Sequence, residues 1–124
     1  MFEIARERTF SASHQLRNYK GRCERLHGHN WRIRVCVSAK DLDSSGMVID
    51  FHELDRMMGL AIEAFDHRHL NDVPAFEKDN PSAENIARAI GESVKNQLAD
   101  TEIRVSYCDV FENDLSRARY IPEY

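Results

Sequence analysis

The stretch that decides the fold is residues 27–39, HGHNWRIRVCVSA. Trp31, Ile33, Val35 and Val37 occupy alternate positions in it, and the residues between them are mostly polar. Because successive side chains of a strand point to opposite faces of a sheet, this alternation predicts a β-strand with one face toward an apolar core.

A second strand is predicted over residues 1–14, separated from the first by a polar loop at residues 15–26. Its apolar side chains share one parity with His14, whereas Arg6 and Arg8 interrupt the apolar stripe. This strand should therefore be long and twisted, or bent in its middle.

Two amphipathic helices are predicted after a turn of residues 43–46. Asp50 can cap the first helix, with Glu53 completing a box-like arrangement. The apolar side chains of residues 51–65 recur at three- and four-residue steps, so they form one helical face that should end near Asp66.

The second helix is predicted to start at residues 80–82, NPS, with Asn80 or Ser82 as its cap. Its buried stripe consists of Ile86, Ala87, Ile90, Val94 and Leu98. Residues 66–81 contain two prolines and no period, which indicates a connecting loop.

Two more strands are predicted at residues 103–111 and 116–121. In the first of them, Ile103, Val105, Tyr107 and Phe111 should share one face. The order ββααββ predicts an α+β fold, a single domain over residues 1–124, with a four-stranded antiparallel sheet and two helices on one face. Such a sheet has two free edges, which favours a homo-oligomer.

Composition narrows the class of protein. The chain has 124 residues, a net charge of −4 and a pI of about 5.8, so nothing indicates a nucleic acid or an anionic membrane as partner. No apolar run reaches the roughly 20 residues of a membrane helix, and the first ten residues are too charged for a secretion signal. We expect a cytoplasmic protein in which Cys23, Cys36 and Cys108 are free thiols.

Three histidines could form a metal site. His27 and His29 lie two positions apart on a strand, so their imidazoles should be about 6.5–7 Å apart on one face. If the first two strands pair, His14 adds a third imidazole beside them. Three histidines with an open fourth position are typical of a catalytic zinc site. The alternative is that His14 bonds to a loop carbonyl and that the other two lie on a polar face by chance.

Four further residues could take part in chemistry. Cys23 precedes His27 by four positions, and its thiolate could move a proton, act as a fourth metal ligand or be inert. Asp66 and His67 could form a proton relay, or His67 could simply complement the dipole of the preceding helix. Glu112 could accept two hydrogen bonds from the amidine-like edge of a guanine or pterin ring, or be an ordinary strand-end charge.

These residues lie in motifs that resemble the 6-pyruvoyl-tetrahydropterin synthase superfamily, and its 6-carboxy-tetrahydropterin synthase branch most closely. The matching stretches run in family order along nearly the whole chain: FSASH (10–14), CERLHGHNW (23–31), GMVIDF (46–51), DHRHLN (66–71), NPSAEN (80–85) and VFE (110–112).

The resemblance implies the tunnelling fold, in which the sheets of three subunits close into a barrel and two trimers stack as a hexamer. It further implies an active site built across a subunit interface. There, His14, His27 and His29 would hold Zn²⁺, and Cys23 would move protons with Asp66 and His67 as its relay.

For the substrate, the resemblance implies a pterin anchored by Glu112, with Ser82 and Glu84 near the pocket. The reaction implied is conversion of 7,8-dihydroneopterin triphosphate to 6-carboxy-5,6,7,8-tetrahydropterin, with loss of acetaldehyde and triphosphate, in queuosine biosynthesis. Alternatives on the same site are a 6-pyruvoyl-tetrahydropterin synthase or a dihydroneopterin side-chain aldolase. A zinc- or pterin-binding module without catalysis is the alternative from another class.

The spacing between Cys23 and His27 resembles that of the carboxy-forming branch. Another branch has a glutamate in the role of the cysteine, and Glu24 leaves this alternative open. The chain departs from the family pattern in two places near the expected pterin pocket, at residues 113–115 and at Ser82, where the family often has threonine. These departures affect the choice of substrate and leave the predicted metal ligands unchanged.

Overall fold

The computed structural model describes residues 1–124. Its elements, in chain order, are β1 (Phe2–His14), β2 (His27–Ala39), α1 (Phe51–Ile62), β3 (Arg68–His69), the 3₁₀ turns η1 (Leu70–Asp72) and η2 (Pro74–Phe76), α2 (Ala83–Gln97), β4 (Arg104–Asn113) and β5 (Ser116–Tyr120). Neither α-helix combines the length and the apolar character needed to span a membrane.

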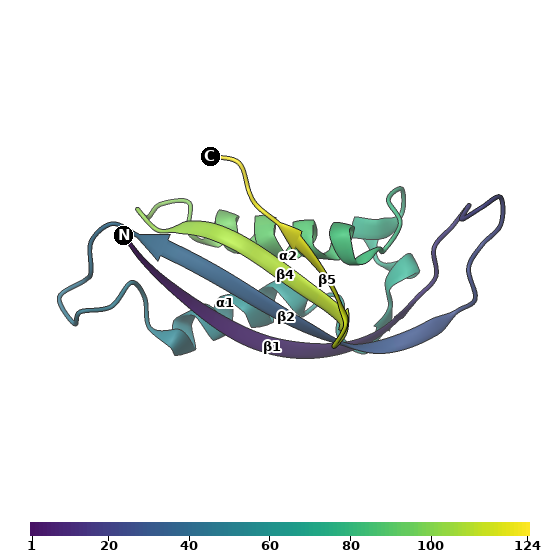
Figure 1. The fold of residues 1–124 in the computed structure, drawn as a ribbon, viewed down its shortest axis with the longest axis horizontal. Coiled ribbons are helices and arrows are strands. Elements are labelled where there is room, and N and C mark those ends of the chain that lie inside the picture. Colours follow the sequence, from purple (N-terminus) through teal and green to yellow (C-terminus); the bar gives the residue numbers. More distant parts are fainter.

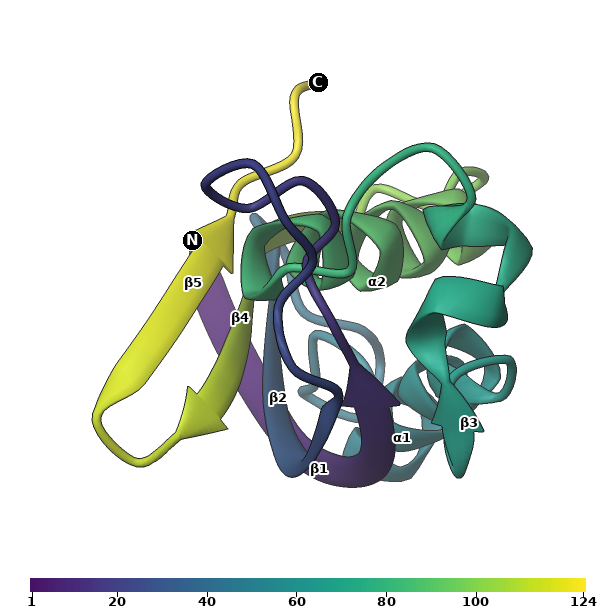
Figure 2. The same ribbon diagram turned by 90° about the vertical axis from the view of Figure 1, so that its right-hand side faces the viewer.

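The sheet has the strand order β3-β1-β2-β4-β5. Both helices pack on one face of it, and the other face is uncovered (Figures 1 and 2). β1 and β2 pair antiparallel along their whole length, from Phe2 opposite Ala39 to His14 opposite His27. The predicted α+β architecture with two helices on one face is therefore confirmed.

The prediction of four antiparallel strands is wrong in one respect, because β3 adds a fifth strand parallel to β1. Residues 66–81 are thus more than a connecting loop. His67 adopts a φ of 61°, in the left-handed region, and its amide donates to the carbonyl of Ser11 at 2.6 Å. This reversal brings the chain back along β1, where two residues suffice to form a short strand.

The core lies between the sheet and the helices. Trp31, Ile33, Val35 and Val37 are all fully buried, as the alternation of residues 27–39 predicts. The helices contribute the other side of the core through their buried residues Leu54, Met57, Met58, Ala61, Ile62, Ile86, Ala87, Ile90 and Val94.

The helix ends follow the predictions only in part. Asp50 caps α1 by accepting from the amide of His52, but Glu53 pairs with Arg56, so no capping box forms. α1 ends at Ile62, before the predicted end near Asp66, and hydrogen-bonded turns continue to residue 67. Ser82 caps α2.

The prediction that Ile103, Val105, Tyr107 and Phe111 share one face of the sheet is correct only for the first two residues. Where β4 pairs with Cys36 and Val37 of β2, the register shifts and Ser106 is an extra residue. Such a bulge reverses the alternation beyond it. The core side is then occupied by Cys108 and Val110, which are fully buried, in place of Tyr107 and Phe111.

Candidate metal centre and active site

Three histidines gather at the end of the β1–β2 hairpin where the loop of residues 15–26 joins the two strands. The register places His14 opposite His27 and Ala12 opposite His29. The three imidazole centroids are 4.6 to 5.2 Å apart. The buried indole of Trp31 supports them, with its centroid 4.9 Å from His14 and 5.0 Å from His29. The pairing of the two strands thus brings His14 beside two histidines that lie 13 and 15 positions further along the chain.

Glu112 brings a carboxylate to this cluster. It is the extra residue at a register shift between β4 and β5, and bulges of this kind often redirect a side chain. Its Oε1 lies 3.0 Å from Nε2 of His29 and 3.4 Å from Nε2 of His14. One donor atom from each of the four side chains lies within 4.8 Å of all the others.

Backbone carbonyls fix the tautomers of two histidines. Nδ1 of His14 lies 2.7 Å from the carbonyl oxygen of Pro81, and Nδ1 of His27 lies 2.7 Å from that of Arg25. A carbonyl can only accept, so each Nδ1 carries the proton and each Nε2 presents a lone pair. The two Nε2 atoms face each other at 3.0 Å. Two lone pairs at this distance repel unless a cation or a proton lies between them.

The surroundings of His29 also favour a cation at this position. Its Nε2 is buried without a hydrogen bond of acceptable geometry, although Glu112 is near. Burial lowers the pKa of His29, the Glu112 carboxylate opposes this effect, and the neighbouring His14 and His27 add to it. Neutral imidazoles with carbonyl-bound Nδ1–H groups are the form in which histidines bind metals. The four donors therefore fit a metal ion, with a carboxylate beside the three predicted imidazoles.

Cys23 lies outside this group. It is exposed on the loop of residues 15–26, which projects beyond the sheet at the end where the histidines lie (Figure 1). Its thiol is free and accessible to solvent. Cys36 and Cys108 are buried in the sheet.

Asp66 and His67 form a pair although they are adjacent in sequence. Nδ1 of His67 lies 2.9 Å from Oδ1 of Asp66, and the same oxygen accepts from the amide of Ser11 at 3.0 Å. The left-handed backbone of His67 turns its ring back toward the carboxylate. A proton relay requires such a contact between the carboxylate and the imidazole. The Asp66 carboxylate is in turn held in place by the Ser11 amide of β1.

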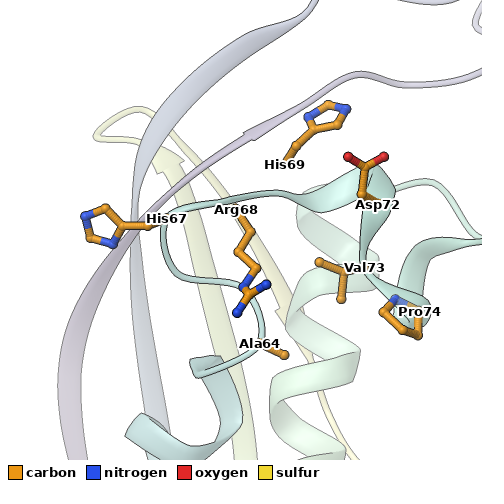
Figure 3. A pocket seen from close by; sticks show the side chains of 7 residues that line it. All are labelled: Ala64, His67, Arg68, His69, Asp72, Val73 and Pro74. Atoms are coloured by element: carbon orange, nitrogen blue, oxygen red, sulfur yellow. The ribbon is translucent and has the colours of Figure 1, made fainter.

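The imidazole of His67 is 82% exposed and makes no hydrogen bond with Cys23 in the same chain. It lines a hollow of about 480 Å³ formed by residues between Ala64 and Pro74, and it points away from His69 and Asp72 (Figure 3). A second, open hollow of about 500 Å³ connects His67 with His29 across the ends of β1 and β2. The ring is thus directed outward, away from the body of its own chain.

The residues expected near the substrate lie on another side of Glu112. A hollow of about 380 Å³ is lined by Glu84 at the start of α2, by Glu112 and by residues 116–119 of β5. Ser82 does not line it; its hydroxyl caps α2 by accepting from the amide of Asn85 at 3.2 Å. Glu112 therefore faces the histidine cluster and this hollow together.

The family model described as 6-pyruvoyl tetrahydropterin synthase matches residues 3–123. The chain belongs to this family. A Bacillus subtilis protein named 6-carboxy-5,6,7,8-tetrahydropterin synthase is 30% identical over 115 residues, which cover 89% of this chain and 77% of that protein. A Synechocystis protein of the same name is 40% identical over 92 residues, 70% of each chain.

The structure of a 6-pyruvoyl tetrahydropterin synthase from Caenorhabditis elegans superposes with a TM-score of 0.84 at 24% identity, covering 98% of this chain and 96% of that one. The likeness shows the same fold. The predicted superfamily, its fold and its class of enzyme, a tetrahydropterin synthase, are thereby confirmed.

Sequence reasoning missed one charged group near the site of this family member. Asp109 is fully buried on the uncovered face of the sheet, where Arg119 donates to it at 2.7 and 3.0 Å and Arg117 at 3.2 Å. The hydrogen bonds that Arg119 donates to the Asp109 carboxylate raise the pKa of Arg119. The alternating arginines of residues 116–120 were the available signal. The group holds β5, and with it one wall of the hollow at Glu112.

Proposed function

We propose that the chain is a zinc-dependent lyase that converts 7,8-dihydroneopterin triphosphate to 6-carboxy-5,6,7,8-tetrahydropterin, releasing acetaldehyde and triphosphate, in queuosine biosynthesis. The observation that carries the proposal is the group of four donors at the end of the β1–β2 hairpin. Relatives named 6-carboxy-5,6,7,8-tetrahydropterin synthase support the choice of product.

His14, His27 and His29 would hold the zinc ion, since neutral imidazoles are preferred zinc ligands and one ring nitrogen of each lies within 4.8 Å of the others. When bound, zinc would polarise the hydroxyl and carbonyl oxygens of the substrate side chain and make the neighbouring C–H groups more acidic. The buried Trp31 beneath the rings excludes water from that side of the site.

Cys23 would move the protons. Its exposed position on the loop next to His27 allows the thiol to approach a substrate bound at the histidines. His67, with its ring oriented by Asp66, would exchange protons between Cys23 and solvent. Because His67 points outward from its own chain, it would serve a Cys23 across a subunit interface.

Glu112 would anchor the pterin by accepting hydrogen bonds from its amidine-like edge. The carboxylate is one-third exposed and borders the hollow that Glu84 also lines. Glu84 would supply a second acceptor for the ring. Ser82 would act nearby through its hydroxyl hydrogen, since the oxygen already accepts from α2.

The proposed assembly is a homo-oligomer, a trimer or a hexamer, acting in the cytoplasm. Support comes from two sheet edges. β5 is an outer strand, and β1 pairs with β3 only at Ala12 and Ser13, so most of its outer edge is free. Head-to-tail pairing of these edges would close the sheets into the barrel of the tunnelling fold.

The test is the identity of the product. Zinc-loaded protein is incubated with 7,8-dihydroneopterin triphosphate, and the pterins are identified by mass spectrometry while acetaldehyde is trapped. A 6-carboxy pterin with acetaldehyde is the expected outcome. A pyruvoyl or side-chain-cleaved pterin would move the chain to another branch of the family, and bound zinc without turnover would make it a binding module.

A further inference from the structure

The loop of residues 15–26 carries Cys23 and is exposed along much of its length. Asn18, Lys20 and Gly21 have left-handed backbones, which cost free energy for the two residues other than glycine. A loop of this kind would move freely unless its stem were held. Three side chains hold the stem, two of them by the same pair of amide hydrogen bonds.

Asn71 provides the first hold. Its Oδ1 accepts from the amide of Gln15 at 3.0 Å, and its Nδ2 donates to the carbonyl of Gln15 at 2.8 Å. The asparagine side chain thus takes the place of a neighbouring strand, immediately beyond the pairing of β1 with β3. The edge of β1 is extended by one residue into the loop.

Asn80 repeats this arrangement two residues further on. Its Oδ1 accepts from the amide of Arg17 at 2.8 Å, and its Nδ2 donates to the carbonyl of Arg17 at 3.1 Å. The carbonyl of Asn80 accepts from Nδ2 of Asn85 in α2 at 2.8 Å. The loop stem is therefore tied to a helix that packs in the core.

Glu24 closes the neck of the loop. Its Oε1 accepts from the amide of Leu16 at 3.2 Å, and its own amide donates to the carbonyl of Leu16 at 2.8 Å. This pairing joins the two sides of the loop one residue from Cys23. The carboxylate is 3.9 Å from Nδ1 of His27, too far for a hydrogen bond.

We propose that Asn71, Asn80 and Glu24 are positioning residues that fix Cys23 relative to the histidine cluster. This inference rests on the proposed role of Cys23. The loop begins directly after His14 and ends directly before His27, so holding its stem fixes the thiol with respect to both. On this proposal the Glu24 carboxylate serves to accept the hydrogen bond from Leu16, and it does not carry protons in the reaction.

The first experiment uses Asn71→Asp and Asn80→Asp, which keep the shape and the accepting oxygen but lose the N–H donor. Asn18→Asp is the matched control, because it makes the same substitution within the loop itself, where Asn18 is exposed and makes no side-chain hydrogen bond. Hydrogen exchange of the amides of residues 15–26 should become faster in both test variants and stay unchanged in the control.

Turnover of the zinc-loaded variants is measured next. Misplacement of a reacting group by about 1 Å can cost about 100-fold, so kcat should fall by about 10- to 100-fold with KM and zinc content unchanged. The proposal is overturned if kcat equals that of Asn18→Asp, or if the loss of turnover follows a loss of zinc. If the parent chain has no synthase activity, the proposed function fails, and hydrogen exchange still tests the hold on the loop.

Two substitutions at Glu24 distinguish a positioning role from a role in proton transfer. Glu24→Gln keeps an oxygen that accepts from Leu16 but cannot carry a proton, and Glu24→Ala loses the acceptor. We expect Glu24→Gln to keep kcat within about threefold of the parent and Glu24→Ala to lose about tenfold, a difference of the size of one hydrogen bond. Loss of turnover in Glu24→Gln with a rigid loop would overturn the assignment.

Discussion

At the scale of single residues, two backbone carbonyls decide what the histidines can do. Pro81 and Arg25 each hold an Nδ1–H, so His14 and His27 present Nε2 lone pairs to each other. The sequence indicates the three histidines because two lie at strand spacing and the third ends the preceding strand. It cannot indicate the carbonyls, since these are brought in by the loop of residues 15–26 and by the segment that precedes α2.

Removing one imidazole should remove the metal. His27→Ala should weaken zinc binding by more than about 100-fold, because groups that merely orient a ligand already contribute 10- to 100-fold. The affinity is measured by competition with a chromophoric chelator. His52→Ala is the control, since this side chain is 91% exposed and outside the cluster. Equal affinities in the two variants would exclude His27 as a ligand.

The three thiols should differ sharply in reactivity. Burial raises the pKa of Cys36, and it raises the pKa of Cys108 to about 12, so both remain protonated and inaccessible at pH 8. Iodoacetamide should modify one thiol per folded, metal-free chain, and peptide mapping should find it at Cys23. In guanidinium chloride all three should react. Rapid native labelling of Cys108 would contradict the described core.

At the scale of elements, periodicity predicts β1, β2 and the two α-helices, because β2 and the helices each have one regular apolar face against the core and β1 has such a face in its second half. β3 is too short to have a period, and it depends on the left-handed backbone of His67. Likewise, the bulges of β4 depend on pairing with β2 and β5. For this reason Glu112 could be predicted as a functional carboxylate, but not as a neighbour of the histidines.

The β4–β5 hairpin should depend on its buried carboxylate. Asp109→Asn leaves Arg117 and Arg119 without a charged acceptor and should lower the free energy of unfolding by about 1–3 kcal/mol, a value reduced by the partial exposure of both arginines. Urea denaturation measures it. Asp114→Asn, in the exposed turn of the same hairpin, should change stability by less than about 0.5 kcal/mol. If Asp109→Asn lowers the free energy of unfolding no more than Asp114→Asn does, the ion pairs of Asp109 do not stabilise the hairpin.

At the scale of the whole molecule, the proposed oligomer explains why His67 faces away from its own chain. If each site takes Cys23 from one subunit and His67 from the next, two inactive variants should complement each other. Cys23→Ala and His67→Ala are unfolded together and refolded as a mixture. Random assembly in a closed ring gives an intact site in about a quarter of cases, so about a quarter of the parent activity should return. Activity no higher than the sum of the separate variants would place both residues in one chain.

The central claim is a metal-dependent synthase built on the β1–β2 hairpin, and reconstitution tests it most directly. Metal-free protein is titrated with zinc while formation of 6-carboxy-5,6,7,8-tetrahydropterin from 7,8-dihydroneopterin triphosphate is followed. The account predicts no product without zinc, a linear rise in rate up to one zinc ion per chain, and acetaldehyde equal to the pterin formed. Equal rates in metal-free protein, or one tightly bound zinc ion without any 6-carboxy product, would contradict it.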